Sequence, residues 1–523
     1  MNVLLVSIDS LRRDFLGAYR DRPRPLDYDV ATPNLDRFAG RATVFDTHYA
    51  GSLFCMPTRR EWLAGVQEFP WRGWGPIEPF DVTVPRAART TGTFTRLVTD
   101  HYHYFQHGAA GYYEDYNAFE FVRGHEFDAW QASPRAPDER LLAQAAATSA
   151  DGVGFVDRAQ YARNVAGFDE EDETDFFAPQ VFSDAAAFVA SADWDDWFCY
   201  VDSFDVHQPF HCPEPYASMY TDEDPRDPDL SFWPRWGRVD GGQGAITERE
   251  LAFARSQFAG KVTMVDRWFG TLLDALDDRG LWDETAVVVT SDHGYSLGDH
   301  GHVGKVHMPM YDVLARTPLL VHHPAGDGGR VTDLTAAVDL HPTLLDLLDA
   351  RSAGDHPHGR SLLPFLTPGD GSGGAAATGG DDDAAPHRRW ALYGEWGSGA
   401  CVTDGRYTYL HPCDPAEPAL AHSTEMLNPR GVFHPRTPEP DAEAGRFLPY
   451  ADAPVWRFEG EAVRRHPDPL LFDVEADPGQ REDVAAERPA VASRMRDLLG
   501  EALAELDAPK SFADRLGVTA RAD

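Results

Sequence analysis

The sequence predicts an α/β protein built on one large, mostly parallel central sheet flanked by helices, with a smaller α+β unit at its C-terminal end. Three observations support this prediction. Four apolar, β-rich runs lack the alternation of half-exposed strands, helical periodicity lies between them, and 523 residues favour one large domain plus a smaller one. The four runs are Val3–Ile8, Thr95–Val98, Trp197–Val201 and Ala286–Thr290.

An amphipathic helix is predicted over Arg255–Leu276, shortly before the last of these runs. Its apolar residues recur at intervals of three or four and form one stripe: Phe258, Val262, Val265, Phe269, Leu272, Leu273 and Leu276. Asp9 directly follows the first of these runs, and Asp292 and His293 lie just beyond the last, after Ser291. Open α/β sheets place their sites at the carboxyl ends of strands, so we expect these three residues to lie close together.

The C-terminal part of the chain is expected to form a separate, smaller unit. Residues 367–387 are rich in Gly, Ala and Asp and are predicted to be a flexible linker. Short strands are expected beyond it, with a tight turn at Asp404-Gly405 and a closing helix over Pro489–Leu506. These strands are Trp390–Trp396, Ala400–Thr403 and Arg406–Leu410. The predicted domains are therefore 1–366 and 388–523.

Charge and composition exclude several classes of partner. The formal net charge is -38, and the lysines are limited to Lys261, Lys305 and Lys510. Such an acidic surface repels nucleic acid and anionic membranes. An excess of carboxylates with so little lysine is typical of adaptation to high salt, as in halophilic archaea, because concentrated salt screens the self-repulsion.

The N-terminal run and the cysteines indicate a soluble, cytoplasmic protein with reduced thiols. Met1–Ile8 lacks a basic leader and is too short for a signal peptide or a membrane span. The five cysteines are odd in number and show no CxxC spacing, which indicates neither a zinc site nor a disulfide framework.

The segment CMPTRREWLAG, which begins at Cys55, combines a candidate nucleophile, a cation and a helix start. Pro57 is compatible with the first turn of a helix, so Cys55 is expected at the helix N-terminus, where the helix dipole favours an anion. Arg59 is expected to face the same anion. For this segment taken alone, a buried structural cysteine is the alternative.

The pattern Cys-x-Pro-x-Arg followed by Leu-x-Gly resembles the signature of type I sulfatases, the formylglycine-dependent hydrolases of the alkaline phosphatase superfamily. Other segments resemble landmarks of this family in the same order. They are MNVLLVSID at 1–9, TSDHGYSLGDHG at 290–301, VDLHPTLL at 338–345, HGRSL at 358–362 and LFDVEADPG at 471–479. The resemblance runs almost from end to end and implies an alkaline phosphatase-like fold with sulfatase activity.

The resemblance implies one divalent cation, with Ca²⁺ as the first expectation and Mg²⁺ or Mn²⁺ as alternatives. Asp9, Asp292 and His293 supply oxygen and imidazole ligands. The formylglycine formed from Cys55 and a sulfate oxygen are expected to complete the coordination shell of the metal. The family often has a second acidic or amide residue where this chain has Ser10. Either the Ser10 hydroxyl is a weak ligand there, or water fills the place.

Further positions match the family's sulfate-binding residues. Lys305, in a chain with so few lysines, is expected at the sulfate, and an exposed surface charge is its alternative. His207 resembles the histidine that contacts the sulfate and the leaving oxygen, whereas His211 is expected to be structural or to lie behind it. His101 and His103 fall where the family shows Lys-x-His, with a histidine-rich surface loop as the alternative.

The resemblance also implies a mechanism. A formylglycine-generating enzyme oxidises Cys55, and the hydrated aldehyde attacks the sulfur of a small-molecule or carbohydrate sulfate ester. His103 is expected to act as the base, and the metal, Arg59 and Lys305 to stabilise the developing charge. His207 or Lys305 protonates the leaving oxygen. Two alternatives stay open: a phosphonate monoester or phosphodiester hydrolase with the same core, and a noncatalytic sulfate- or metal-binding protein.

Overall fold

The computed structural model describes residues 1–19, 26–146, 158–241, 246–351, 358–367, 386–429 and 441–520. Its largest sheet has eight strands in the order β12-β2-β11-β8-β1-β6-β4-β5. β11 runs antiparallel to both neighbours, and the other described strand pairs of this sheet are parallel, which confirms the predicted fold class. The strands are β1 (Asn2–Ile8), β2 (Thr43–Tyr49), β4 (Phe94–Thr99), β5 (Ala118–Phe121), β6 (Trp197–Ser203), β8 (Thr285–Thr290), β11 (Leu319–His322) and β12 (Gly329–Ala336).

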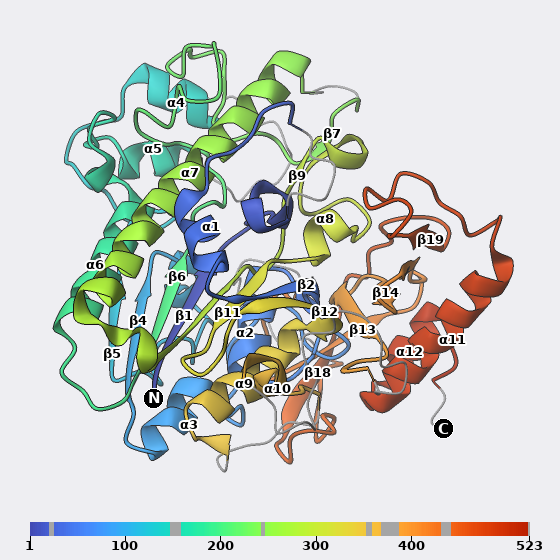
Figure 1. Ribbon diagram of the computed structural model, residues 1–523. Coiled ribbons are helices and arrows are strands. Elements are labelled where there is room, and N and C mark those ends of the chain that lie inside the picture. The colour runs from blue at the N-terminus through green and yellow to red at the C-terminus, as the bar shows by residue number, and fades with distance from the viewer. Residues whose placement is uncertain are drawn as a thin grey trace.

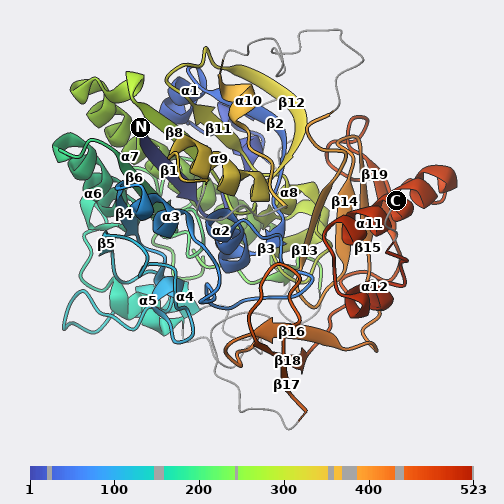
Figure 2. The same cartoon turned by 90° about the horizontal axis from the view of Figure 1, so that it is seen from below.

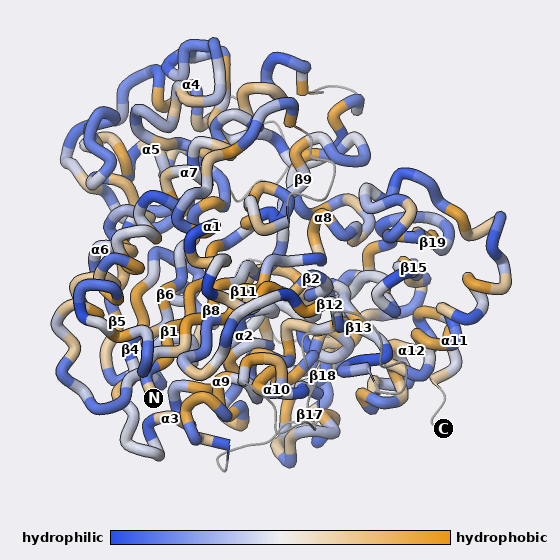
Figure 3. Tube along the Cα trace, in the orientation of Figure 1, coloured by the Kyte–Doolittle hydropathy of each residue, from blue (hydrophilic) through white to orange (hydrophobic). Residues whose placement is uncertain are grey.

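Helices cover both faces of the central sheet (Figure 1). Alternate residues of β1 point to opposite faces, so Leu4, Val6 and Ile8 join one core cluster while Val3 and Leu5 join another. Burial on both faces explains why this strand reads as a continuous apolar run, and Figure 3 shows the hydrophobic colours on the strands of this sheet. The first face is covered by α1 (Pro33–Ala39), α4 (Glu139–Ala146), α5 (Ala159–Asn164), α6 (Phe177–Ser191) and α7 (Glu248–Arg279), and the second by α2 (Cys55–Ala64), α3 (Val84–Thr90), α9 (Leu340–Leu347) and α10 (Leu363–Leu366).

Helix α7 contains the predicted amphipathic helix and extends it at both ends. Its N-terminus has a capping box, in which the Thr247 hydroxyl accepts from the Glu250 N–H and the Glu250 carboxylate accepts from the Thr247 N–H. It ends at Gly280, whose φ of 64° lies in the left-handed region that glycine adopts readily.

Four C-terminal strands and the short strand β3 form a second sheet, in the order β19-β15-β14-β13-β3, beside α11 and α12 (Figure 2). The predicted strands and closing helix are confirmed, and the predicted turn at Asp404-Gly405 connects β14 to β15. The elements are β3 (Ser52–Leu53), β13 (Ala391–Glu395), β14 (Ala400–Thr403), β15 (Tyr407–His411), β19 (Leu470–Asp473), α11 (Pro489–Glu505) and α12 (Lys510–Leu516).

Strand β3 ties the segment before Cys55 to this C-terminal sheet. Ser52 pairs with Gly394 and Leu53 pairs with Glu395, both in parallel register. The C-terminal sheet therefore supports the backbone that leads directly into α2. The domain boundaries at 366 and 388 stay a prediction, and residues 368–385 of the predicted linker lie outside the described residues.

The remaining elements are short. Two three-stranded sheets have the orders β7-β10-β9 and β16-β18-β17. Within the described ranges, the helices are too short or too polar to cross a membrane. These elements are β7 (Gly237–Arg238), β9 (Ser296–Leu297), β10 (His302–Gly304), β16 (Ala419–Ser423), β17 (Glu443–Gly445), β18 (Val455–Gly460) and α8 (Asp312–Ala315).

Candidate active site

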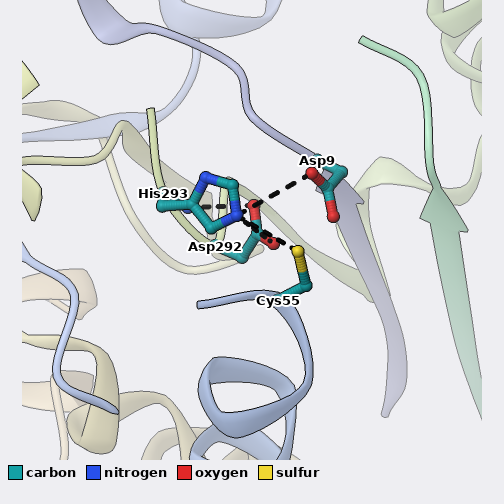
Figure 4. A group of neighbouring side chains, drawn as sticks. All are labelled: Asp9, Cys55, Asp292 and His293. Atoms are coloured by element: carbon teal, nitrogen blue, oxygen red, sulfur yellow. Dashed lines mark hydrogen bonds and ion pairs between the residues drawn. The ribbon is translucent and has the colours of Figure 1, made fainter. Parts of the chain in front are cut away.

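Four buried side chains from three segments meet at the carboxyl edge of the central sheet (Figure 4). Asp9 follows β1, Asp292 and His293 follow β8, and Cys55 is the first residue of α2. One potential ligand atom from each lies within 4.8 Å of the others. The parallel strands β1 and β8 end side by side, so the predicted convergence of the three strand-end residues is confirmed.

Cys55 lies at the N-terminus of α2 because the local sequence begins and ends a helix there. Pro57 lies in the first turn, as predicted, and the helix ends at Gly65 with φ 76°. A side chain at Gly65 is also excluded by packing, because an added Cβ would lie 2.5 Å from His341 Nδ1. The positive end of the α2 dipole therefore points toward the group at position 55.

The Lys305 ammonium lies at the centre of the site. Its Nζ donates to Cys55 Sγ at 2.8 Å, to His207 Nε2 at 2.9 Å and to His293 Nε2 at 3.2 Å. An ammonium has three N–H donors and no acceptor, so these contacts use all of its donors. Lys305 is buried, which excludes the alternative of a surface charge.

The Lys305 contacts determine the tautomers of both histidines. Because each Nε2 accepts from Lys305, the ring proton of the neutral imidazole is on Nδ1. That proton points to the Gly294 carbonyl at 2.8 Å in His293 and to the Gln208 carbonyl at 2.7 Å in His207. Burial lowers the pKa of His293 to about 3 and also lowers the pKa of His207. Both rings are therefore neutral near pH 7, and the Nε2 lone pair of His293, which here accepts from Lys305, is the one that would bind a metal in place of the ammonium.

The guanidinium of Arg59 contacts the carboxylates around the cluster. Its Nη1 donates to Asp292 Oδ2 at 2.6 Å, and its Nη2 lies 3.0 Å from Asp9 Oδ2 and 2.8 Å from Asp202 Oδ1. Nη1 also donates to the Cys55 carbonyl at 3.3 Å. The sequence predicts that Arg59 faces the anion at position 55; its donors are directed at three carboxylates and at the Cys55 carbonyl, and its role in stabilising charge on the substrate stays a prediction. Arg59 thereby joins the candidate ligands to α2.

Asp202 is a site residue that the sequence analysis missed. It lies on β6, pairs in register with Ser7 of β1, and its Oδ2 accepts from the Tyr104 hydroxyl at 2.7 Å. The sequence contains a pattern that could have identified it, because Asp202 directly follows the apolar run Trp197–Val201, just as Asp9 follows Val3–Ile8. Both aspartates therefore reach the same edge of the sheet.

The charges of the cluster fit a divalent cation. Burial and the neighbouring Asp292 raise the pKa of Asp9 well above its usual value. Although burial opposes it, the nearby His293 and Arg59 lower the pKa of Asp292. Two facing carboxylates in a buried site are the oxygen ligands that Ca²⁺ and Mg²⁺ prefer, and such an ion would stabilise both as anions.

Ser10 lies against both carboxylates. Its hydroxyl donates to Asp9 Oδ1 at 2.7 Å and its N–H donates to Asp292 Oδ1 at 3.0 Å. Ser10 thereby orients the two candidate ligands, and its own ligation of a metal stays a prediction.

His101 and His103 are both buried next to the cluster, so the alternative of a histidine-rich surface loop is wrong. His101 Nε2 lies 3.8 Å from Asp9 Oδ2. His103 Nδ1 lies 2.7 Å from Gln106 Oε1. His211, in contrast, contacts Glu170 at 3.2 Å and packs among aromatic rings, as expected for a structural residue.

Comparisons with known proteins place the chain among sulfatases and their structural relatives. The model of the sulfatase family matches residues 1–350. The chain is 25% identical over 430 residues to the multifunctional alkaline phosphatase superfamily protein PehA of Trinickia caryophylli, covering 70% of this chain and 77% of PehA. It is 24% identical over 387 residues to the arylsulfatase of Clostridium perfringens, covering 70% of this chain and 78% of that enzyme. The solved phosphonate monoester hydrolase of Agrobacterium radiobacter shares the fold, with a TM-score of 0.60 and 20% identity over 97% of this chain and 95% of that one.

Proposed function

The chain belongs to the sulfatase family and is a sulfuric ester hydrolase, and we propose that it acts through a formylglycine made from Cys55 beside one divalent cation. The contact of Lys305 Nζ with Cys55 Sγ at 2.8 Å supports this proposal most directly. It places a cation against position 55, next to the strand-end cluster of Asp9, Asp292 and His293.

The thiol itself is a poor nucleophile in this environment. Burial and the neighbouring Asp9 raise the pKa of the Cys55 thiol well above its usual value, so it stays protonated at neutral pH. Oxidation by a formylglycine-generating enzyme would replace the sulfur by an aldehyde, whose hydrate supplies a hydroxyl nucleophile. In our proposal that hydroxyl would lie near the position of Cys55 Sγ, beside Lys305.

The cation would be held by Asp9, Asp292 and His293, with Ser10 or water completing the protein side of the shell. We propose Ca²⁺, with Mg²⁺ or Mn²⁺ as alternatives, because carboxylate oxygens dominate the cluster. When bound, the ion polarises the sulfuryl oxygens and the nucleophile. Arg59 keeps the carboxylates of Asp9 and Asp292 aligned through its ion pairs.

The remaining site residues would bind sulfate and move protons. Lys305 stabilises charge on the sulfuryl group, and His101, whose Nε2 lies 3.8 Å from Asp9 Oδ2, is a second candidate for binding the sulfate. His103 serves as the base in our proposal. Lys305 supplies the proton for the leaving oxygen, either directly or by way of His207, whose Nε2 accepts from the Lys305 ammonium.

Peptide mass spectrometry and a comparison of substrates test this proposal together. Position 55 should carry formylglycine in active preparations, and the rate should follow the fraction oxidised. An aryl sulfate should be hydrolysed with a higher kcat/KM than a phosphodiester or a phosphonate monoester. Full activity with an unmodified Cys55 would contradict the mechanism, and a preference for a phosphorus ester would support the alternative hydrolase instead. The natural substrate we propose is a small-molecule or carbohydrate sulfate ester.

Chelation should remove activity and lower the melting temperature. Without the cation, Asp9 and Asp292 face each other in a buried site, where the pKa of Asp9 is already raised. Adding Ca²⁺, Mg²⁺ or Mn²⁺ back should restore both properties, as measured by turnover and thermal unfolding. Undiminished activity after exhaustive chelation, with no metal found by elemental analysis, would contradict the proposed metal site.

We also propose that the chain is adapted to high salt, as in halophilic archaea. The net charge is -38, and Lys261 and Lys305 are both buried, which leaves Lys510 as the exposed lysine. The melting temperature should rise between about 0.1 M and about 3 M KCl, because salt screens the carboxylates and strengthens apolar burial. Thermal unfolding at constant pH measures this, and equal stability at both concentrations would contradict the adaptation.

A further inference from the structure

Glu126 contacts two site histidines but has no role in the mechanism described above. Its side chain is only 5% exposed. Its Oε1 lies 3.3 Å from His207 Nδ1, and its Oε2 lies 3.9 Å from His103 Nε2. The Tyr102 hydroxyl donates to Oε2 at 3.1 Å, which holds the carboxyl group in place.

The tautomer of His207 determines which ring nitrogen carries the proton and faces Glu126. Lys305 occupies Nε2, so the ring proton is on Nδ1 and faces both the Gln208 carbonyl and Glu126 Oε1. Glu126 therefore lies behind the ring, while the opposite nitrogen faces the Lys305 ammonium that contacts Cys55. A carboxylate in this position orients a histidine and stabilises its protonated form.

The surroundings of Glu126 raise its pKa, so that its carboxyl group changes charge near neutral pH. Burial raises the pKa of Glu126 to about 7, although Lys305, the hydrogen bond from Tyr102 and more distant cations oppose this shift. The titratable and charged groups that face the carboxyl are Lys305, Tyr102, Arg158, Lys261, His103 and His207. Above pH 7 the group is a carboxylate, which stabilises the positive charge that the otherwise neutral His207 ring gains when it takes up a proton from Lys305 during the reaction, and below pH 7 it is neutral.

We propose that Glu126 is the positioning residue that holds His207 as the acid for the leaving alcohol. This inference rests on the proposed function, in which a proton of the Lys305 ammonium passes to His207 Nε2 and from there to the leaving oxygen. The Nδ1–H donates to the Gln208 carbonyl, and the Glu126 carboxylate, 3.3 Å from Nδ1, compensates the charge of the ring whenever Nε2 also carries a proton.

The leaving-group dependence of Glu126→Gln tests this role. An amide has the same shape but cannot compensate an imidazolium, so the loss should grow as the leaving alcohol needs more protonation. With phenyl sulfate, whose leaving group needs a proton, kcat should fall about 100-fold. With para-nitrophenyl sulfate, whose leaving group is stable as an anion, it should fall less than about tenfold. KM should change little, and Glu126→Asp should recover part of the loss because it keeps the charge.

The acid limb of the pH profile provides a second readout. In the wild type, kcat for phenyl sulfate should fall below about pH 7, as Glu126 becomes protonated and stops compensating His207. In Glu126→Gln this limb should be absent. A structural defect would lower the whole profile without removing one limb.

Glu170→Gln is the matched control, because Glu170 also pairs with a histidine, His211, at 3.2 Å. His211 has no hydrogen bond to Lys305 or Cys55 among the described residues. The control should show nearly equal kcat values to the wild type for both esters. Equal losses with both esters in Glu126→Gln, or identical behaviour of the two variants, would overturn the inference.

Histidine ¹⁵N NMR separates this inference from the proposed function. In the wild type, His207 should appear as the Nδ1–H tautomer, and Glu126→Gln should lower its pKa or mix its tautomers. An unchanged His207 signal would overturn the inference even if catalysis proved to follow another route. A wild-type enzyme with oxidised Cys55 that hydrolyses neither sulfate ester would instead contradict the proposed function.

Discussion

Cys55→Ala should abolish sulfate-ester turnover, with a fall in kcat of at least about 10⁴-fold, while the protein still folds. Alanine cannot be oxidised to the aldehyde, and it removes the group that Lys305 Nζ contacts at 2.8 Å. Loss of one small buried side chain should cost about 1 kcal/mol of unfolding free energy. Aryl sulfate kinetics and thermal unfolding measure the two effects separately.

Cys401→Ala is the matched control for this prediction. Cys401 is 3% exposed and lies on β14 in the C-terminal sheet, so its replacement should cost similar stability but leave kcat unchanged. Cys55→Ser should stop after one turnover, because a serine sulfate ester has no second hydroxyl to drive release. Intact-mass spectrometry should then detect one added sulfuryl group. Full activity of Cys55→Ala, or many rapid turnovers of Cys55→Ser, would contradict the assigned nucleophile.

Lys305→Met should lower kcat by about 10³-fold. The ammonium donates to Cys55, His207 and His293 at once, so its loss removes charge stabilisation and frees both imidazoles. Lys305→Arg should not restore the rate, because a planar guanidinium cannot direct three donors from one atom. Steady-state kinetics with an aryl sulfate, alongside the melting temperature, measure the outcome.

Lys510→Met provides the control for the removal of a lysine. The Lys510 side chain is 86% exposed and pairs with Asp514 at the surface, where an ion pair contributes little. Its kcat should stay within about twofold of the wild type. A Lys305→Met enzyme that keeps wild-type turnover would show that the buried ammonium has no part in the reaction.

The sequence by itself determined four of the eight strands of the central sheet, β1, β4, β6 and β8, together with the long helix and the residues that follow β1 and β8. Strands buried on both faces produce apolar runs, and β1 and β8 were predicted within one residue of their observed starts. Asp9 directly follows the first run, and Asp292 and His293 follow the other after Ser291, so a local pattern placed them at one edge of the sheet. The start of α2 was equally local, because Pro57 and Gly65 mark the two ends of that helix.

Only the tertiary structure decided how these parts act on one another. Arg59 and Asp202 meet although 143 positions separate them, and Lys305 reaches Cys55 across 250 positions. Glu126 comes from a loop without a motif, and its contact with His207 depends on how that loop packs. Charge placement, tautomers and pKa values in a buried site arise from such long-range contacts and from the loss of water, neither of which leaves a periodic signal in the chain.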